Sequence, residues 1–176
     1  MFLFCRWVSL GGLVLTVTGC QFGWRSPSFT TLNSRYNDGE PALSGNGRLL
    51  ALVSNRGSNS QILLYDLQGD RFLELPALYG GEAIADSPSL SRTGRYLVYL
   101  VTLEGRPTIA FYDRLTRRSE LLTQGYRSWI RNPRVSPDGR YIVFESARRG
   151  QWDIEVLDRG PLVELDIEDG ALVINP

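Results

Sequence analysis

Three segments of the chain begin alike, and this internal repeat limits the possible folds more than any other feature of the sequence. Proline, serine, glycine and arginine stand at the same offsets in Pro41–Arg48, Pro88–Arg95 and Pro133–Arg140, which start 47 and 45 residues apart. Each start is followed by an apolar run, a turn-like stretch, a second run that ends in aspartate, and a short fourth run. A unit of this length in three copies indicates a repeat architecture.

Each unit is predicted to contain four β-strands. The second-strand runs are Leu49–Val53, Tyr96–Val101 and Tyr141–Phe144. The third-strand runs are Ile62–Asp66, Ile109–Asp113 and Ile154–Asp158, and the fourth-strand runs are Phe72–Leu75, Glu120–Thr123 and Leu162–Asp166. A run such as Leu49–Val53 has no polar face, so it is expected to be buried on both sides.

Four-stranded units that are each covered by a neighbour on both faces are typical of β-propeller blades. The sequence therefore predicts an all-β, propeller-type repeat fold with three four-stranded blades in an open or incomplete array. The blades cover about 41–87, 88–132 and 133–176. A tight hairpin is expected between the first two strands of each blade, where Pro137 and Asp138 suit the central turn positions and Gly139 takes a positive φ. Gly47 and Gly94 stand at the equivalent place.

The third unit resembles the blade repeat of TolB-type periplasmic propellers, which also occurs in prolyl-oligopeptidase-like propellers. The resemblance rests on the string Val135-Ser-Pro-Asp-Gly-Arg-Tyr-Ile-Val-Phe144 followed by Ile154–Asp158. It implies a β-propeller and a non-enzymatic, protein-binding role in the cell envelope. The chain departs from that family in two respects: nothing in it corresponds to an N-terminal α/β domain, and it has three units where TolB-like rings have six.

The N-terminus is predicted to be a targeting signal rather than part of the folded domain. Residues 1–19 have one charge, a short apolar run and small residues, as in a secretory signal, and the run is shorter than a membrane span. The ending Val17-Thr18-Gly19-Cys20 resembles a bacterial lipobox, which predicts cleavage before Cys20 and lipidation of Cys20. In the bacterial lipoproteins that this ending resembles, an aspartate after the cysteine retains the protein in the inner membrane, so the resemblance implies the outer membrane for a chain with Gln21 there. Residues 20–35 are expected to be a tether. The alternatives are an uncleaved anchor and a chance cysteine after an ordinary signal.

Three blades leave one apolar face bare at each end of the stack. Three solutions stay open at this point. Phe29–Leu32 and Ala171–Ile174 cap the ends, two chains pair as a homodimer, or the gene is truncated.

The composition excludes several classes of chemistry. The net charge is zero, which argues against nucleic acid as a partner. The chain has no histidine, and all 19 basic residues are arginine, so zinc sites, P-loops and Schiff-base lysines are not expected. Cys5 and Cys20 both precede the repeats. We expect no cofactor and no metal.

The acidic residues have local explanations. Asp66, Asp113 and Asp158 each end a strand, where aspartate usually bonds the backbone of the next residues as an Asx-turn. Asp153 and Glu155 share a strand face, but they lack the spacing of a calcium loop. Ser44, Ser91 and Ser136 have no base to activate them and are interpreted as structural.

Charge is unevenly distributed, and this points to a candidate binding surface. Residues 106–150 carry a net charge of +6, and residues 151–176 carry −6. Arginine and tryptophan are typical interface anchors. The candidate partner-binding residues are Arg127, Trp129, Arg131, Arg134, Arg148 and Arg149. The alternative is that these arginines pair with the acidic segment that follows.

The leading functional hypothesis is a non-enzymatic, lipid-anchored scaffold of the bacterial cell envelope that faces the periplasm and binds an envelope protein. A second hypothesis is a structural subunit, or a truncated relic, of a larger propeller. A third is a propeller hydrolase that would depend on Asp153 or Glu155.

Overall fold

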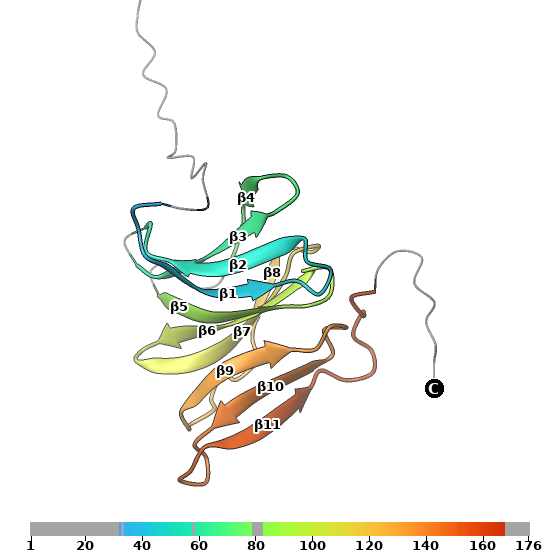
Figure 1. Cartoon of the computed structure of the whole chain (residues 1–176). Helices are drawn as coiled ribbons and strands as arrows, with labels where there is room; N and C mark the ends of the chain where they lie inside the picture. The colour runs from blue at the N-terminus through green and yellow to red at the C-terminus, as the bar shows by residue number, and fades with distance from the viewer. Residues whose placement is uncertain (1–31, 33, 58, 79–82, 168–176) are drawn as a thin grey trace, which may run out of the picture.

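Three antiparallel β-sheets are stacked in chain order in the computed structural model, which describes residues 32, 34–57, 59–78 and 83–167 (Figure 1). The first sheet contains β1 (Asp38–Leu43), β2 (Leu49–Ser54), β3 (Gln61–Asp66) and β4 (Arg71–Leu73). The second contains β5 (Ile84–Leu90), β6 (Tyr96–Leu103), β7 (Arg106–Asp113) and β8 (Arg118–Leu121). The third contains β9 (Ile130–Val135), β10 (Tyr141–Ser146) and β11 (Asp153–Asp158).

This arrangement confirms the all-β, propeller-type fold, with one correction in the third unit. Leu162–Asp166 was expected to be a fourth strand, but the chain turns there without forming one, and β11 lies at the edge of the described sheet. The physical reason is that Glu164 and Asp166 bond to the second sheet instead. Within the described ranges no helix is long and apolar enough to cross a membrane. Cys20 and the proposed cap Ala171–Ile174 lie outside the described residues, as does Phe29–Leu32 except for Leu32.

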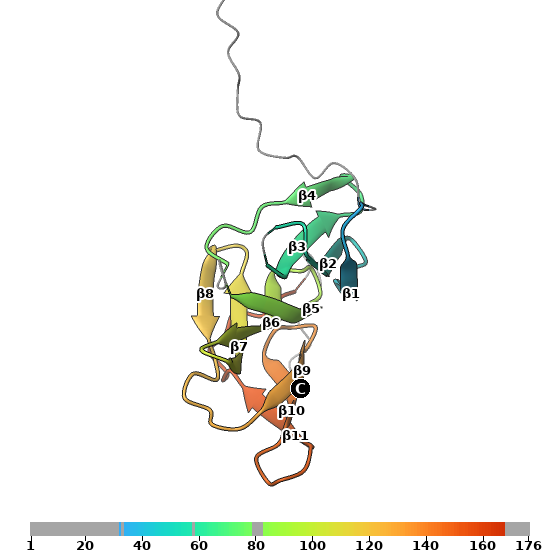
Figure 2. The ribbon, with the colours of Figure 1, turned by 90° about the vertical axis from the view of Figure 1, so that its left-hand side faces the viewer.

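Each first strand contains a β-bulge, which the sequence pattern did not predict. Glu40, Ser87 and Asn132 precede the repeated proline and have φ values of 49°, 53° and 52°. The strand registers shift at these points. A bulge bends its strand and increases the local twist. The bent first strands lie against one another in sequence, β1 against β5 and β5 against β9 (Figure 2).

The hairpin turns form as predicted and also connect the sheets. Gly47, Gly94 and Gly139 have φ values of 71°, 72° and 82°. Each repeated serine hydroxyl accepts a hydrogen bond of 2.9 Å from the first backbone N–H of the second strand, which confirms a structural role. Between sheets, Asn46 N donates to Arg92 O and Arg92 N donates to Pro137 O, both at 2.8 Å.

Two apolar layers hold the three sheets together. In each sheet we call the face toward the next sheet along the chain the leading face and the opposite face the trailing face. Four residues at equivalent repeat positions form each leading face. They are Leu49, Ala51, Ile62 and Leu64 in the first sheet, Tyr96, Val98, Ile109 and Phe111 in the second sheet, and Tyr141, Val143, Ile154 and Val156 in the third sheet. The trailing faces include Leu43, Leu50, Leu52, Leu63 and Tyr65 in the first sheet, Leu90, Leu97, Tyr99, Ala110 and Tyr112 in the second sheet, and Ile142, Phe144 and Leu157 in the third sheet.

The middle sheet is covered on both faces, as its continuous apolar runs predict. All of Tyr96–Val101 is buried. In β10, by contrast, exposed and buried residues alternate from Tyr141 to Phe144, because only the trailing face has a neighbouring sheet in the described structure. The expectation of burial on both sides is therefore wrong for β10.

Candidate interaction surface

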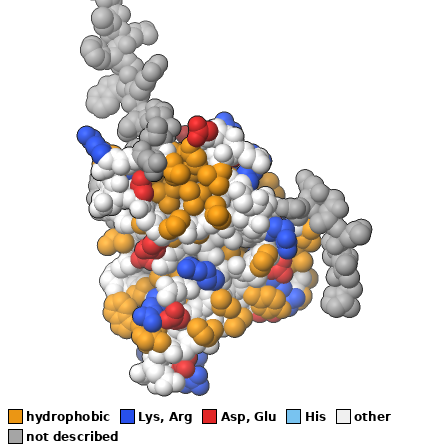
Figure 3. Space-filling model, in the orientation of Figure 1, with side chains coloured by type: hydrophobic (Ala, Val, Ile, Leu, Met, Phe, Trp, Pro, Cys, Tyr) orange, Lys and Arg blue, Asp and Glu red, His pale blue; other side chains and the backbone are white. Residues whose placement is uncertain are grey.

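The leading face of the third sheet is an exposed apolar surface built by two strands. In the register of β10 and β11, Val143 lies opposite Val156, and Glu145 lies opposite Ile154. Opposed residues of an antiparallel pair share one face. Tyr141, Val143, Ile154 and Val156 are all exposed. Hydrophobic side chains are visible over β9–β11 and, as a larger group, over the first sheet (Figure 3).

The repeat shows that this face has the character of an inter-sheet contact. Val98 is 0% exposed, whereas its equivalent Val143 is 37% exposed. Ile109 is 0% exposed and Ile154 is 70% exposed; Phe111 is 3% exposed and Val156 is 61% exposed. The same positions that pack one sheet on the next are thus apolar in the third sheet and face solvent there.

Two of the predicted binding residues border this face. Arg131 lies opposite Glu145 and Arg134 lies opposite Val143 in the pairing of β9 with β10. Arg131 forms an ion pair of 2.7 Å with Glu145, and its guanidinium lies 3.9 Å from the centre of the Trp152 ring. Hydrogen bonds from Asn132 and Arg131 lower the pKa of Glu145. The face is therefore apolar in the middle and has a charged, hydrogen-bonded border.

The other predicted residues lie at one end of the third sheet. Ala147 N donates to Trp129 O at 2.9 Å, which brings the start of β9 beside the turn between β10 and β11. Arg149 forms an ion pair of 2.9 Å with Asp153, as the pairing alternative predicts. Arg127, Trp129 and Arg148 are exposed, and no ion pair of theirs occurs among the described residues.

Trp152 and the four apolar leading residues were not singled out as candidate site residues. The repeat pattern could have identified the four apolar residues, because each of them aligns with a buried residue of the second unit. Periodicity alone does not reveal which copy of a repeat lacks a neighbour.

The aspartates that end the third strands serve the fold. Asp66 accepts from Gln68 N and Gly69 N, Asp113 from Leu115 N, and Asp158 from Gly160 N, which confirms the Asx-turns. Each also pairs with the arginine of its own repeat, at distances of 2.9, 3.2 and 2.9 Å. The partners, 18 residues earlier in each case, are Arg48, Arg95 and Arg140. In the described part of the chain no cluster of acidic or cysteine side chains is placed to hold a metal ion.

These ion pairs control the protonation of the carboxylates. Hydrogen bonds from Arg48 and from Gly69 N lower the pKa of Asp66 to about 2. Hydrogen bonds from Arg140 and Gly160 N likewise lower the pKa of Asp158 to about 2. Burial opposes ionisation of Asp113, but the hydrogen bonds from Arg95 and Leu115 N outweigh it, so that pKa is lowered too. All three carboxylates are held as anions, which suits a structural ion pair better than proton transfer.

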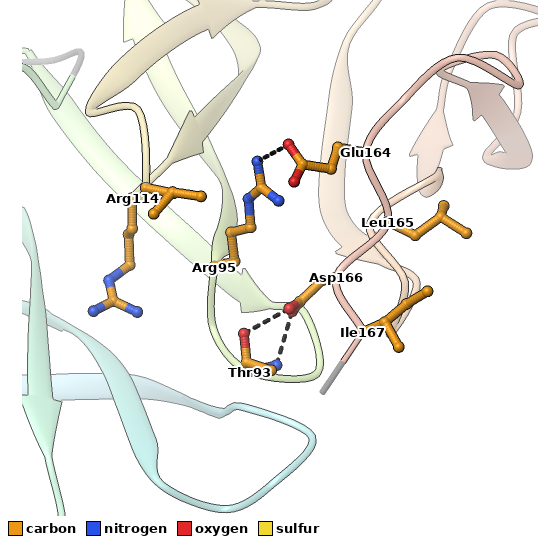
Figure 4. Close-up of a pocket in the computed structure, with 8 residues that line it drawn as sticks. Thr93, Arg95, Arg114, Glu164, Leu165, Asp166 and Ile167 are labelled. Atoms are coloured by element: carbon orange, nitrogen blue, oxygen red, sulfur yellow. Dashed lines mark hydrogen bonds and ion pairs between the residues drawn. The ribbon is translucent and has the colours of Figure 1, made fainter. Parts of the chain in front are cut away.

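A pocket of about 510 Å³ lies where the C-terminal segment crosses the second sheet's turn (Figure 4). Asp166 accepts hydrogen bonds from Ser91 Oγ, Thr93 Oγ1 and Thr93 N, the last at 2.8 Å. Glu164 pairs with Arg95 at 2.7 Å, and Arg114 Nη1 donates a hydrogen bond of 2.9 Å to Gly94 O of the same turn. The carboxylates are thus engaged in holding residues 164–167 on the turn.

Comparison with protein-family models and with curated proteins finds no match for this chain. Among solved structures it is similar to TolB from Acinetobacter baumannii, with 27% identity and a TM-score of 0.59 over 73% of this chain and 31% of that one. It is also similar to a putative TolB from Agrobacterium tumefaciens, with 24% identity and a TM-score of 0.59 over 73% and 45% of the chains.

The fold likeness extends to the β-propeller domain of the Trilobed protease from Pyrococcus furiosus, which has an open Velcro topology. The identity is 20% and the TM-score 0.52, over 70% of this chain and 39% of that one. The chain spans less than half the length of each of these three proteins. Its sheets therefore correspond to one portion of a TolB-like propeller.

Proposed function

Since the chain has the β-propeller fold of TolB, we propose that it is a non-enzymatic protein-binding module of the bacterial cell envelope. The observation that carries this proposal is the leading face of the third sheet. Its apolar positions are those that bury completely between the second and third sheets. Soluble monomers rarely leave a contiguous apolar face of this kind uncovered, and such faces mark protein interfaces.

The residues on and around this face support a protein rather than a small molecule as the ligand. Tyr141, Trp152 and Arg131 are of the residue types that are enriched in interface centres. The face is a sheet surface with alternating side chains, whereas small-molecule sites are concave. A partner with an apolar surface and a few acceptors for arginine would fit it.

The side chains that could otherwise do chemistry are engaged in the fold. The repeated serine hydroxyls bond the backbone, and the strand-ending aspartates pair with arginine. Asp153 pairs with Arg149, and Glu155 accepts from Tyr126 Oη at 2.6 Å. This use of Asp153 and Glu155 supports a non-enzymatic role over a hydrolase.

The envelope location rests on the lipobox-like ending at Cys20 together with the likeness to TolB. We propose that Cys20 carries the lipid, that the domain faces the periplasm and that the outer membrane is its site. Exchange of Cys20→Ser is expected to release the protein from the membrane fraction or to leave the signal uncleaved. An N-terminus found by mass spectrometry at another residue, without lipid, would contradict this assignment.

A second candidate function is that of a structural subunit of a larger propeller. It is favoured by β11, which has a single neighbouring strand in the described third sheet, whereas β3 and β7 each have two. A free strand edge together with a free leading face is what a blade would offer to the next blade.

Site-specific photocrosslinking in intact cells tests the protein-binding function. A photoreactive residue replaces Val156 on the leading face, and the matched control replaces Leu162, which is 98% exposed but outside that face. We expect a protein adduct from position 156 and none from position 162. A folded protein that forms no adduct at position 156 would overturn the proposed function.

A further inference from the structure

We propose that the occupant of the third sheet's leading face is the trailing face of the first sheet of a second copy of this chain. Two copies then close one ring through two identical contacts. The inference rests on the proposed function, because it names the partner of the same face. Three features of the described residues support it.

First, no sheet of the described chain covers the trailing side of the first sheet, although Leu52 and Tyr65 on that side are buried. A Cβ at Gly94 would lie 2.7 Å from Leu49 Cδ1, and one at Gly139 would lie 2.1 Å from the Tyr96 ring. A Cβ at the equivalent Gly47 would meet no atom within 4 Å. Similarly, Leu43 is 58% exposed, whereas its equivalent Leu90 is 7% exposed.

Second, the residues that would meet across the new contact match in shape and polarity. Leu49 and Tyr96 fill the space at the next turn glycine, and their equivalent in the third sheet is Tyr141. Tyr141 of one copy would therefore pack on Gly47 of the other. Within the chain, the Arg159 guanidinium lies 3.7 Å from the Phe111 ring centre.

The equivalents of Arg159 and Phe111 continue this match. They are Leu67 in the first unit, which is exposed, and Val156 in the third. The stacking of arginine on an aromatic ring is thus replaced by a contact between two aliphatic side chains. Leu67 of one copy and Val156 of the other are both aliphatic, so the two side chains match in polarity.

Third, the charges of β9 disfavour contact between two third sheets. First strands of successive sheets lie against one another, so β9 of one copy would lie against β1 of the other. The leading side of β9 exposes Arg131 and Arg134. In β1, Asp38 pairs with Arg56 at 2.7 Å, and Glu40 accepts a hydrogen bond of 2.6 Å from Ser87 N of its own chain. Two third sheets would oppose arginine to arginine, whereas β9 against β1 opposes no like charges.

The count of sheets agrees with closure by two copies. Closed propellers have four to eight blades. Two copies of three sheets give six, and each copy offers one leading and one trailing face. The same contact made twice covers the two outer faces of the described sheets in both copies.

Molar mass and complementation test the inference on the full chain in detergent, by light scattering at several concentrations. Wild type is expected at the mass of two chains. Ile154→Asp on the leading face and Leu43→Asp on the trailing face are each expected to give single chains. An equimolar mixture of the two variants is expected to recover pairs, since one intact contact remains between them. Leu162→Asp is the control and is expected to stay paired.

A photocrosslink keeps the inference testable if an apolar variant does not fold. A photoreactive residue at Val156 is expected to form an adduct with a second copy of this chain, at the peptide that contains Leu67. A wild-type mass of one chain, pairing that survives Leu43→Asp, or a mixture that stays as single chains would each overturn the inference. Adducts from position 156 to a different protein, together with a wild-type mass of one chain, would overturn it while leaving the protein-binding function intact.

Discussion

At the scale of single residues, the same small set of contacts is made three times. The arginine after each turn glycine pairs with the aspartate 18 residues later, and that aspartate also accepts from the following backbone. A single carboxylate thus joins the start of the second strand, the end of the third strand and the turn that follows. Charge-assisted bonds of this kind are shorter and stronger than neutral ones.

Acid is expected to destabilise the domain through these carboxylates. The pKa of Asp66 and Asp158 is about 2 in the folded chain, against 3.8 for an unperturbed aspartate. A depressed folded-state pKa contributes stability that is present above about pH 4 and is lost as the pH falls toward 2. Thermal melts at pH 7, 4, 3 and 2 should show this loss. The double variant Asp66→Asn, Asp158→Asn should melt lower at pH 7 and change less below pH 4; an equally steep fall would count against the assignment.

The turn glycines are expected to differ in their tolerance of a methyl group. Gly139 and Gly150 both have φ of 82°, but only a Cβ at Gly139 meets a neighbour, the Tyr96 ring. Gly150→Ala should lower the free energy of unfolding by about 1 kcal/mol through backbone strain alone. Gly139→Ala should lower it by about 3 kcal/mol, because overpacking adds to the strain. Chemical denaturation measures both, and equal losses would contradict the contact between turn and ring.

Sequence patterns predict much at this scale and miss some of it. The positive φ at Gly47, Gly94 and Gly139 follows from the residue type and the turn pattern. The bulges at Glu40, Ser87 and Asn132 do not, because none of these residue types requires a positive φ. The bulge at Asn132 decides which side chains of β9 join the leading face, so Arg131 and Arg134 could be proposed as binding residues but not placed.

At the scale of elements, the C-terminal segment replaces a missing turn contact. Asn46 and Asp138 each accept from the serine two residues earlier and from the N–H two residues later. The second repeat has Thr93 at this position, and buried Asp166 takes the serine hydroxyl instead. This long-range substitution explains why Leu162–Asp166 does not pair with β11. No local pattern could have shown it.

Removal of Asp166 and repair at Thr93 test that explanation. Asp166→Ala should lower the free energy of unfolding by about 2–4 kcal/mol, because it leaves buried donors without their charged acceptor. Adding Thr93→Asn supplies the local acceptor that the first repeat uses, so about half of the loss should return. Denaturant melts of the single and double variants give both values. A neutral Asp166→Ala, or a double variant no better than the single one, would contradict the substitution.

At the scale of the whole molecule, the stack of three sheets explains both the stability of the middle and the character of the ends. The second sheet is buried on both sides, while the first and third each keep one face that repeats the chemistry of an internal contact. The sequence already predicted that the outer blades need cover. It could not identify the cover, because a repeat pattern describes each unit by its own residues and not by its neighbours.

The most direct measurement for the account is the reactivity of the third sheet's leading face in the native envelope. Single cysteines replace Ile154 on that face and Leu162 outside it, each in a chain that keeps Cys20, and both are labelled with a maleimide in intact membranes and again after unfolding. The account predicts that the cysteine at position 154 is protected until the protein is unfolded, while the cysteine at position 162 reacts at once. Equal and immediate labelling at both positions would contradict the claim that this face is an interface in the working protein.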